Sequence, residues 1–288
     1  MIRIIWRFTD KYILLGLILL LAFWDKISKP FCKSNIKSEY KKILIIKLSA
    51  LGDTVMMVPI MRALRNRLPD CKISALVTGL NEEALRACPY LNRILILNLR
   101  NPRAAISVII ELRKEKFDLI IDFEQRIKLS ALIAYFAGAK QTTGFVTKSY
   151  FRHYLYSNKI THKKELHEFK CMSELVKDIT GEICDTSLEF WILEKDNKWA
   201  EDFLSINNLI AKRLVVLHPG CGAVYLRGAR AREWSKEYFA QLATALQDKY
   251  NAQILISGSR EEIGLAQEIS SQMKNKPLIL SGKVNIGR

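Results

Sequence analysis

The sequence predicts an α/β protein made of two Rossmann-like halves, each built on a parallel sheet. Short, unbroken apolar runs recur along the chain, as expected for strands that are buried on both faces of a sheet. Stretches with helical periodicity separate these runs, and such strand–helix–strand repeats form parallel sheets through right-handed crossovers. The chain has 288 residues, enough for two domains, and 49% are hydrophobic, which excludes a disordered or fibrous protein.

The first half begins at residue 41. Its strands are predicted where Ile, Leu and Val cluster, over residues 43–46, 73–77, 94–97 and 119–122, with a fifth over 141–145. Helices are predicted between these strands, over residues 54–68, 82–88, 103–116 and 125–137. The half is completed by a basic, aromatic loop over 148–164, a helix near 166–178 and a strand near 188–192.

The second half repeats the pattern over a shorter length. Its strands are predicted over residues 214–217, 252–257 and 277–280, and its helices over 236–249 and 261–274. We place the boundary between residues 195 and 212, where the charge density rises, and predict domains over 41–195 and 196–288. Three strands and two helices make about half of a doubly wound sheet, so we expect the second domain to be incomplete.

Residues 1–40 form a separate N-terminal segment. Between Lys11 and Asp25 lie thirteen uncharged residues, which as a helix are about 20 Å long. A bilayer core of about 30 Å requires about 20 apolar residues, so this segment is too short to span it comfortably. We therefore expect a hydrophobic anchor or shallow hairpin in the membrane interface, followed by a basic linker that faces anionic lipid. The alternative is a buried helix that packs on the body of the protein.

The charge and cysteine content exclude several classes of protein. The formal net charge is +16, but no nucleic-acid recognition motif accompanies it, so we expect no nucleic-acid partner. No GxGxxG follows a predicted strand, which disfavours a dinucleotide-dependent oxidoreductase. The six cysteines form no CxxC pair, which leaves a zinc site unsupported and indicates reduced thiols in a cytosolic protein. Nine basic and three acidic residues in the first 42 positions contribute +6, which favours anionic lipid as a partner.

Candidate functional residues are sought in the loops after the strands, because Rossmann-like halves bind ligands outside the carboxyl ends of their strands. The first such loop is the turn from the first strand into the first helix, and it contains Ser49, Gly52 and Asp53. Gly52 permits a positive φ or a close approach of the backbone to a ligand. Asp53 has two interpretations, as the N-cap of the helix or as a general base toward a sugar hydroxyl.

Two further loops contain ligand-binding candidates. Gly220 and Gly222 follow a predicted strand and precede three arginines, the last of which is Arg232. Glycines and guanidinium groups in this order suit a diphosphate, although a glycine-rich loop with solvated arginines has the same composition. Glu261 and Glu262 follow a Gly-Ser turn at the start of a helix, where negative charge is also favoured by the helix dipole alone.

The fourth candidate is the basic stretch from residue 148 to residue 170, which includes Lys163 and Lys164. It is either a solvated basic face or a surface that attracts an anionic ligand. His162 and His167 are five positions apart, so they do not share a helical face as a metal-binding pair would. We therefore predict no metal site here.

The stretch from Lys42 to Asp70 contains a specific motif. An apolar strand leads into Leu-Ser-x-Leu-Gly-Asp, and Val, Pro and Leu-Arg follow in order before a Pro-Asp pair. This stretch resembles the opening of the family 9 glycosyltransferases, whose best-known members are the ADP-heptose:lipopolysaccharide heptosyltransferases. The resemblance continues through the His-Glu-Phe that begins at His167 and through the second half. It implies a GT-B fold and inverting transfer with Asp53 as the base, without an essential metal or other cofactor.

The resemblance also implies where the substrates bind. Donor phosphates and ribose would lie against the candidates in the second half, which are Gly220, Gly222, Arg232 and one of Glu261 and Glu262. The family has a Lys where Arg232 stands here, and Arg offers a planar, bidentate group instead of a point charge. The acceptor would lie against Ser49, Gly52, Lys163 and Lys164.

The function implied is transfer of heptose, or a related sugar, from an ADP-sugar to a lipopolysaccharide core or other lipid-linked acceptor. The expected location is the cytoplasmic face of the inner membrane, with peripheral or N-terminal attachment. The resemblance further predicts an Asp-Thr/Ser-Gly-Pro-x-His segment after residue 283, which is not found up to Arg288. We therefore expect a C-terminally truncated chain. The alternative is a catalytically inactive, membrane-associated remnant or binding module.

Overall fold

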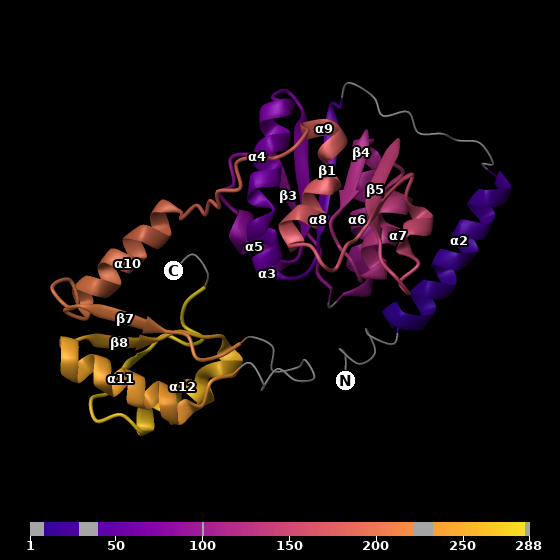
Figure 1. Cartoon of the computed structure of the whole chain (residues 1–288). Coiled ribbons are helices and arrows are strands. Elements are labelled where there is room, and N and C mark those ends of the chain that lie inside the picture. The colour runs from indigo at the N-terminus through magenta and orange to yellow at the C-terminus, as the bar shows by residue number, and fades with distance from the viewer. Residues whose placement is uncertain (1–8, 29–39, 100, 222–232, 286–288) are drawn as a thin grey trace. The chain divides into compact units, whose positions relative to one another are not determined.

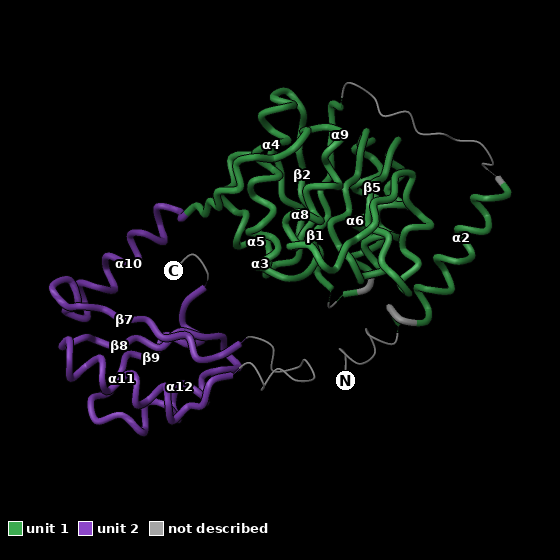
Figure 2. The backbone as a smooth tube through the Cα atoms, in the orientation of Figure 1, with its two compact units in different colours: residues 1–191 green, residues 192–288 purple. Residues whose placement is uncertain are grey.

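The computed structural model describes residues 9–28, 40–99, 101–221 and 233–285 (Figure 1). The chain divides into two compact units, Met1–Trp191 and Ile192–Arg288, which are coloured separately in Figure 2. Each unit contains its own parallel sheet, and the predicted α/β fold class is confirmed. Most of the segment expected to contain the boundary, residues 195–212, belongs to a helix, α10 (Glu194–Ile206), which is part of the second unit.

Unit 1 is built on a six-stranded parallel sheet with the order β3-β2-β1-β4-β5-β6. The strands are β1 (Lys42–Lys47), β2 (Lys72–Val77), β3 (Arg93–Ile96), β4 (Leu119–Asp122), β5 (Gln141–Val146) and β6 (Asn158–Thr161). The two central strands, β1 and β4, are almost wholly buried, which explains their unbroken apolar sequences. Because all strands are parallel, their carboxyl ends meet at one edge of the sheet.

Helices cover both faces of this sheet. One face carries α3 (Leu51–Met56), α4 (Val58–Arg67), α5 (Gly79–Leu85), α8 (Glu168–Glu174) and α9 (Lys177–Thr180). The other carries α6 (Pro102–Glu115), α7 (Lys128–Ala137), the 3-10 turn η2 (Arg152–Leu155) and α2 (Leu14–Ser28), which is preceded by the π-helical turn η1 (Thr9–Ile13). The core of unit 1 therefore has two apolar layers, one on each side of the sheet.

Three predictions for unit 1 are wrong in detail. The helix expected over 54–68 divides at Met57, because Pro59 lies at the start of α4 and has no N–H for a continuous helix. The helix expected near 166–178 likewise divides into α8 and α9. The basic loop over 148–164 contains η2 and β6, and β6 escaped detection because an edge strand with alternating burial has no apolar run.

The strand expected near 188–192 is also absent from the described structure. Side chains of the first unit bind this segment in place of a neighbouring strand. The guanidinium of Arg62 donates hydrogen bonds to the carbonyls of Asp185 and Ser187 at 3.1 and 3.2 Å, and it pairs with the carboxylate of Glu189. The hydroxyl of Tyr90 also donates to Glu189. The segment therefore packs on unit 1 as an irregular extended connection.

The N-terminal helix α2 packs on α7 and η2 by one side. Ile18 is fully buried in the second apolar layer, with Leu14 and Leu21 beside it. The hydroxyl of Tyr135 in α7 donates to Oδ1 of Asp25 at 2.9 Å, and burial together with this carboxylate raises the pKa of Tyr135 to about 12. No helix in the described part of the chain is long and apolar enough to cross a bilayer.

Unit 2 has a three-stranded parallel sheet of order β7-β8-β9. Its elements after α10 are β7 (Leu214–Leu217), α11 (Lys236–Tyr250), β8 (Gln253–Ile256), the 3-10 turn η4 (Arg260–Glu262), α12 (Ile263–Ser271) and β9 (Leu278–Ile279). Both α11 and α12 pack on the sheet through small and branched apolar side chains. Five of the six cysteines lie in the described residues, and all five are free thiols.

Candidate active site

The turn between β1 and α3 forms the centre of the site. Its left-handed residue is Ala50, with φ 61°, and not Gly52, which lies in the first turn of α3. Of the two roles predicted for Gly52, it does not adopt a positive φ, and a close approach of the backbone to a ligand stays a prediction. A Cβ built on Gly52 meets no atom within 4 Å, so the backbone here is open to a ligand. Asp53 is not the N-cap, because the helix begins at Leu51 and Ala50 holds the cap position.

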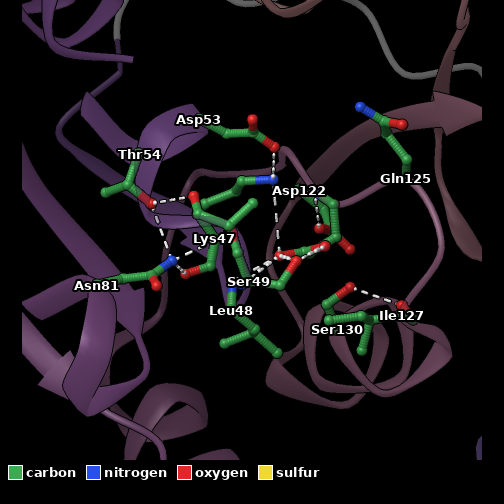
Figure 3. A network of polar contacts seen from close by, with 12 residues as sticks. Lys47, Leu48, Ser49, Asp53, Thr54, Asn81, Asp122, Gln125, Ile127 and Ser130 are labelled. Atoms are coloured by element: carbon green, nitrogen blue, oxygen red, sulfur yellow. Dashed lines mark hydrogen bonds and ion pairs between the residues drawn. The ribbon is translucent and has the colours of Figure 1, made fainter. Parts of the chain in front are cut away.

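A buried amide holds this turn in shape. Asn81 in α5 is fully buried, and its Nδ2 donates to Oγ1 of Thr54 at 2.8 Å and to the carbonyl of Ser49 at 3.2 Å (Figure 3). The hydroxyl of Thr54 in turn lies 3.2 Å from the carbonyl of Ala50. These bonds fix the backbone on both sides of the strained residue. The sequence analysis missed Asn81, since a single polar residue in a short helix gives no signal of its own.

Asp53 belongs to a cluster of three charged side chains (Figure 3). The ammonium Nζ of Lys47, the last residue of β1, lies 3.1 Å from Oδ2 of Asp53 and 3.8 Å from Oε1 of Glu124. The side chains of Lys47 and Glu124 are each 3% exposed, whereas that of Asp53 is 27% exposed. Asp53 is therefore the member of this cluster that an incoming substrate can reach.

Glu124 lies after β4, and its carboxylate binds the backbone of the turn between β1 and α3. Its Oε1 accepts hydrogen bonds from the backbone N–H groups of Leu48 and Ser49, both at 2.7 Å, and the Ser49 hydroxyl lies 3.0 Å from both carboxylate oxygens. Burial raises the pKa of Glu124, while Lys47 and the donors of the turn oppose the increase. Ser49, predicted to bind the acceptor, thus contacts Glu124 in this structure.

A buried ion pair fixes the backbone of Glu124. Oδ1 of Asp122 accepts the N–H of Glu124 at 3.0 Å, and Arg152 donates to the Glu124 carbonyl. Nη2 of Arg152 lies 2.7 Å from Oδ2 of Asp122, and the hydroxyls of Ser130 and Tyr156 complete the group. The exposed fractions of the Arg152 and Asp122 side chains are 1% and 0%. These buried contacts hold the backbone of Glu124 in place next to the turn that contains Asp53.

The predicted basic residues Lys163 and Lys164 are exposed and follow β6, at the same sheet edge as Asp53. Their loop is anchored by its neighbours. Nε2 of His162 lies 3.2 Å from Glu168, to which Gln125 also donates a hydrogen bond. β6 is separated from β1 by β4 and β5, and the structure gives neither lysine a direct contact with Asp53.

The donor-side candidates lie after β7 and β8 of unit 2. Glu262 is 4% exposed, and its Oε2 accepts the N–H of Ser259 at 2.6 Å in a capping box. A Cβ on Gly220 would lie 2.0 Å from Oε1 of Glu262, so the structure brings these two candidates together. Glu261 is exposed. The remaining candidates, Gly222 and Arg232, lie outside the described residues.

Lys47, Glu124 and Arg152 were not predicted as site residues. The available signals were a lysine at the end of an apolar strand and a glutamate two positions after the end of β4. Among the described residues, no three His, Cys, Asp or Glu side chains are grouped as metal ligands would be. The site thus consists of one accessible carboxylate on a rigid, charged support, at the carboxyl edge of a parallel sheet.

Comparison with solved structures places the chain among glycosyltransferase folds. It is similar to a family 9 glycosyl transferase from Veillonella parvula, with a TM-score of 0.74 and 21% identity over 88% of this chain and 72% of that one. For ADP-heptose LPS heptosyltransferase II of E. coli, the TM-score is 0.68, with 20% identity over 85% and 74%. For E. coli heptosyltransferase WaaC with ADP, the TM-score is 0.62, with 18% identity over 83% and 73%.

Comparison of the sequence with models of protein families shows the family to which the chain belongs. The model of glycosyltransferase family 9 (heptosyltransferase) matches residues 105–288, which is more than half of the chain. The protein therefore belongs to glycosyltransferase family 9, and its enzyme class is that of a glycosyltransferase. The expected fold class and family are confirmed.

Proposed function

We propose that this protein transfers heptose, or a related sugar, from an ADP-sugar to a lipid-linked acceptor such as a lipopolysaccharide core, with inversion at the anomeric carbon. The observation that carries the proposal is Asp53, an accessible carboxylate at the carboxyl edge of the sheet with Lys47 at 3.1 Å. The names of the similar structures support the choice of donor. One is an ADP-heptose LPS heptosyltransferase, and WaaC is described with ADP and with an ADP-2-deoxy-2-fluoro heptose.

In the proposed reaction, Asp53 accepts the proton of the attacking acceptor hydroxyl. A bond forms between that oxygen and the anomeric carbon as the bond from this carbon to the β-phosphate oxygen breaks, and the electron pair leaves with ADP. One in-line displacement inverts the configuration. General base catalysis of this kind contributes about 10²- to 10⁴-fold to a rate. Lys163 and Lys164, which are exposed at the same edge of the sheet, would attract an anionic acceptor, since exposed cations raise its local concentration.

The donor is assigned to unit 2 in this proposal. Backbone at Gly220 would approach the diphosphate, and Glu262 would accept a hydrogen bond from the ribose; Gly222, Arg232 and Glu261 remain candidates for the same ligand. We favour Glu262 over Glu261 because its carboxylate lies directly against Gly220, whereas Glu261 is exposed to solvent. Charge-assisted bonds to phosphate are about twice as strong as neutral ones, which would make Arg232 important for affinity.

Release of ADP tests the proposed reaction. The full chain is incubated with ADP-heptose and a lipid-linked core acceptor, and nucleoside diphosphate is measured against UDP-glucose as the control donor. We expect acceptor-dependent release of ADP and none of UDP. A folded protein that binds ADP-heptose but releases no ADP would favour the alternative function, a catalytically inactive remnant or binding module, and would contradict the proposal.

We further propose that α2 attaches the protein to the cytoplasmic face of the inner membrane. The helix has no charged residue from Leu14 to Trp24, but only one side is buried on unit 1. The exposed side chains opposite Ile18 are large and apolar: Ile13, Leu17, Leu20, Phe23, Trp24 and Ile27. Contiguous exposed patches of this kind mark interaction sites, and aromatic residues with nearby lysines suit a lipid interface. The basic excess of the first 42 residues favours an anionic bilayer over a second copy of the chain.

Vesicle sedimentation tests this attachment. Leu20 and Ile27 are 69% and 62% exposed, so replacing both with Glu removes no packing on unit 1. Burial of such side chains is worth about 1.5–3 kcal/mol each, so we expect a loss of binding to phosphatidylglycerol vesicles of at least tenfold. The matched control is Ile206→Glu with Ile210→Glu on unit 2, which should bind normally. Unchanged vesicle binding by the α2 variant would contradict the proposal. So would a wild-type protein that forms dimers through α2, with the substitutions abolishing the dimer and leaving vesicle binding unchanged.

A further inference from the structure

The net charge of the cluster formed by Lys47, Asp53 and Glu124 suggests a role for Glu124. Lys47 provides one positive charge, and Asp53 and Glu124 provide two negative charges within 4 Å of it. The side chains of Lys47 and Glu124 are almost completely buried. In such surroundings an uncompensated charge is unfavourable, so the sum of the three charges affects the protonation of each group.

Without Glu124, Asp53 and Lys47 would form a simple ion pair. A cation at this distance favours the ionised form of a carboxylate, which makes the carboxylate a weaker base. Proton uptake by Asp53 would then leave a buried, unpaired ammonium. With Glu124 present, the same proton uptake converts a cluster of net charge −1 into a neutral one. The second carboxylate therefore favours the step that general base catalysis requires.

We propose that Glu124 is a positioning residue that neutralises Lys47 and thereby keeps Asp53 basic enough to accept the acceptor's proton. This inference rests on the proposed function, in which Asp53 is the base. Glu124 is suited to the role because it cannot turn away. Its carboxylate is fixed by the N–H groups of Leu48 and Ser49 at 2.7 Å, and its backbone by Asp122 and Arg152.

Other charged groups around the cluster are themselves paired. Asp122, at the end of β4, is bound by Arg152 of η2 at 2.7 Å. Glu168 of α8 is bound by Gln125 and lies 3.2 Å from His162, which follows β6. Burial raises the pKa of Glu124, whereas the Lys47 ammonium opposes the increase. The comparison between variants, and not a single midpoint, is therefore the informative measurement.

The test compares two substitutions with opposite expected effects. Glu124→Gln retains the shape and an oxygen acceptor but removes the negative charge, so proton uptake by the remaining carboxylate should move to lower pH. Lys47→Met removes the cation and leaves two neighbouring carboxylates, so proton uptake should move to higher pH. The double variant should lie between the two. The midpoints are measured on the full chain by NMR of ¹³C-labelled carboxylates, with Glu201→Gln, an exposed residue of α10, as the matched control.

Kinetics provide the second readout. The acid limb of kcat/KM for ADP release should move in the same directions as the NMR midpoints, with kcat of Glu124→Gln about tenfold lower and KM little changed. Shifts in one common direction, or no shifts, would overturn the inference. If Glu124→Gln does not fold, Lys47→Met and the double variant decide. Full activity of Asp53→Asn would instead refute the proposed base, whereas an inactive Asp53→Asn with unmoved midpoints in the other variants would refute only the role of Glu124.

Discussion

Substitution of Arg152 by Met should destabilise unit 1 severely. Arg152 is 1% exposed, and its guanidinium binds the carboxylate of Asp122, the hydroxyl of Ser130 and the carbonyl of Glu124. Met fills much of the same volume but donates no hydrogen bond. The change therefore leaves the Asp122 carboxylate, which is fully buried, without its counter-ion, and Tyr156 and a backbone N–H remain as its donors.

The expected loss follows from two independent estimates. Removal of one partner from a buried ion pair costs about 3–5 kcal/mol. Alternatively, the carboxyl group can take up a proton, and for an ordinary carboxylic acid with a pKa near 3.9 this costs about 4 kcal/mol at pH 7. The two values agree, and they amount to a large part of the roughly 5–15 kcal/mol that stabilises a typical domain.

Urea denaturation at pH 7, followed by circular dichroism, measures the loss. The control is Arg86→Met, which removes an exposed pair with Glu82 on α5 and should cost about 0.3–0.5 kcal/mol. Adding Asp122→Leu to Arg152→Met should restore part of the stability, because it removes the unpaired carboxylate. A loss below about 1 kcal/mol for Arg152→Met, close to that of the control, would refute the assignment of this pair as a buried support.

Two further predictions concern the start of β1 and the loop after β7, where we propose that the donor binds. Burial of Asp118 disfavours ionisation, but Lys140 and two backbone N–H groups outweigh it and lower the pKa of Asp118. The ionised Asp118 carboxylate therefore stabilises the fold above about pH 3.9, and this contribution is lost as the pH falls further. Asp118→Asn should lower the free energy of unfolding by about 1–3 kcal/mol at pH 7. In unfolding curves measured at acid pH, the difference between the variant and wild type should disappear. For Gly220→Ala, the new methyl would displace Glu262, so the Kd for ADP by calorimetry should rise about tenfold, whereas Gly264→Ala, with nothing within 4 Å, should leave it unchanged.

Much of the fold could be predicted because its central strands are continuous apolar runs. β1 and β4 were found from their sequences alone, and so was the turn that contains Asp53. The errors occurred where tertiary contacts replace local signals. β6 is a polar edge strand, and the segment expected as a strand near 188–192 is held by Arg62 from a distant helix.

Prediction of the residues that support Asp53 would have required the order of the strands in the sheet, which a single sequence does not reveal. Ile46 and Asp122 are paired across β1 and β4, so Lys47, which ends β1, and Glu124, two positions after the end of β4, become neighbours. Lys47 and Glu124 are far apart in the sequence, and nothing in the sequence shows that the two strands near them are neighbours in the sheet. The loop after β7 shows the opposite case, since Gly220 and Glu262 were predicted separately and lie together in the structure.

The central claim is that Asp53 is the base of a glycosyl transfer, and the most direct test is the rate of ADP release by Asp53→Asn. The change retains the size of the side chain and removes its basicity, and Asp70→Asn, at an exposed position, is the matched control. The account predicts that kcat falls about 10²- to 10⁴-fold in Asp53→Asn, with binding of ADP-heptose retained and Asp70→Asn unaffected. A kcat within about twofold of wild type in Asp53→Asn would contradict it.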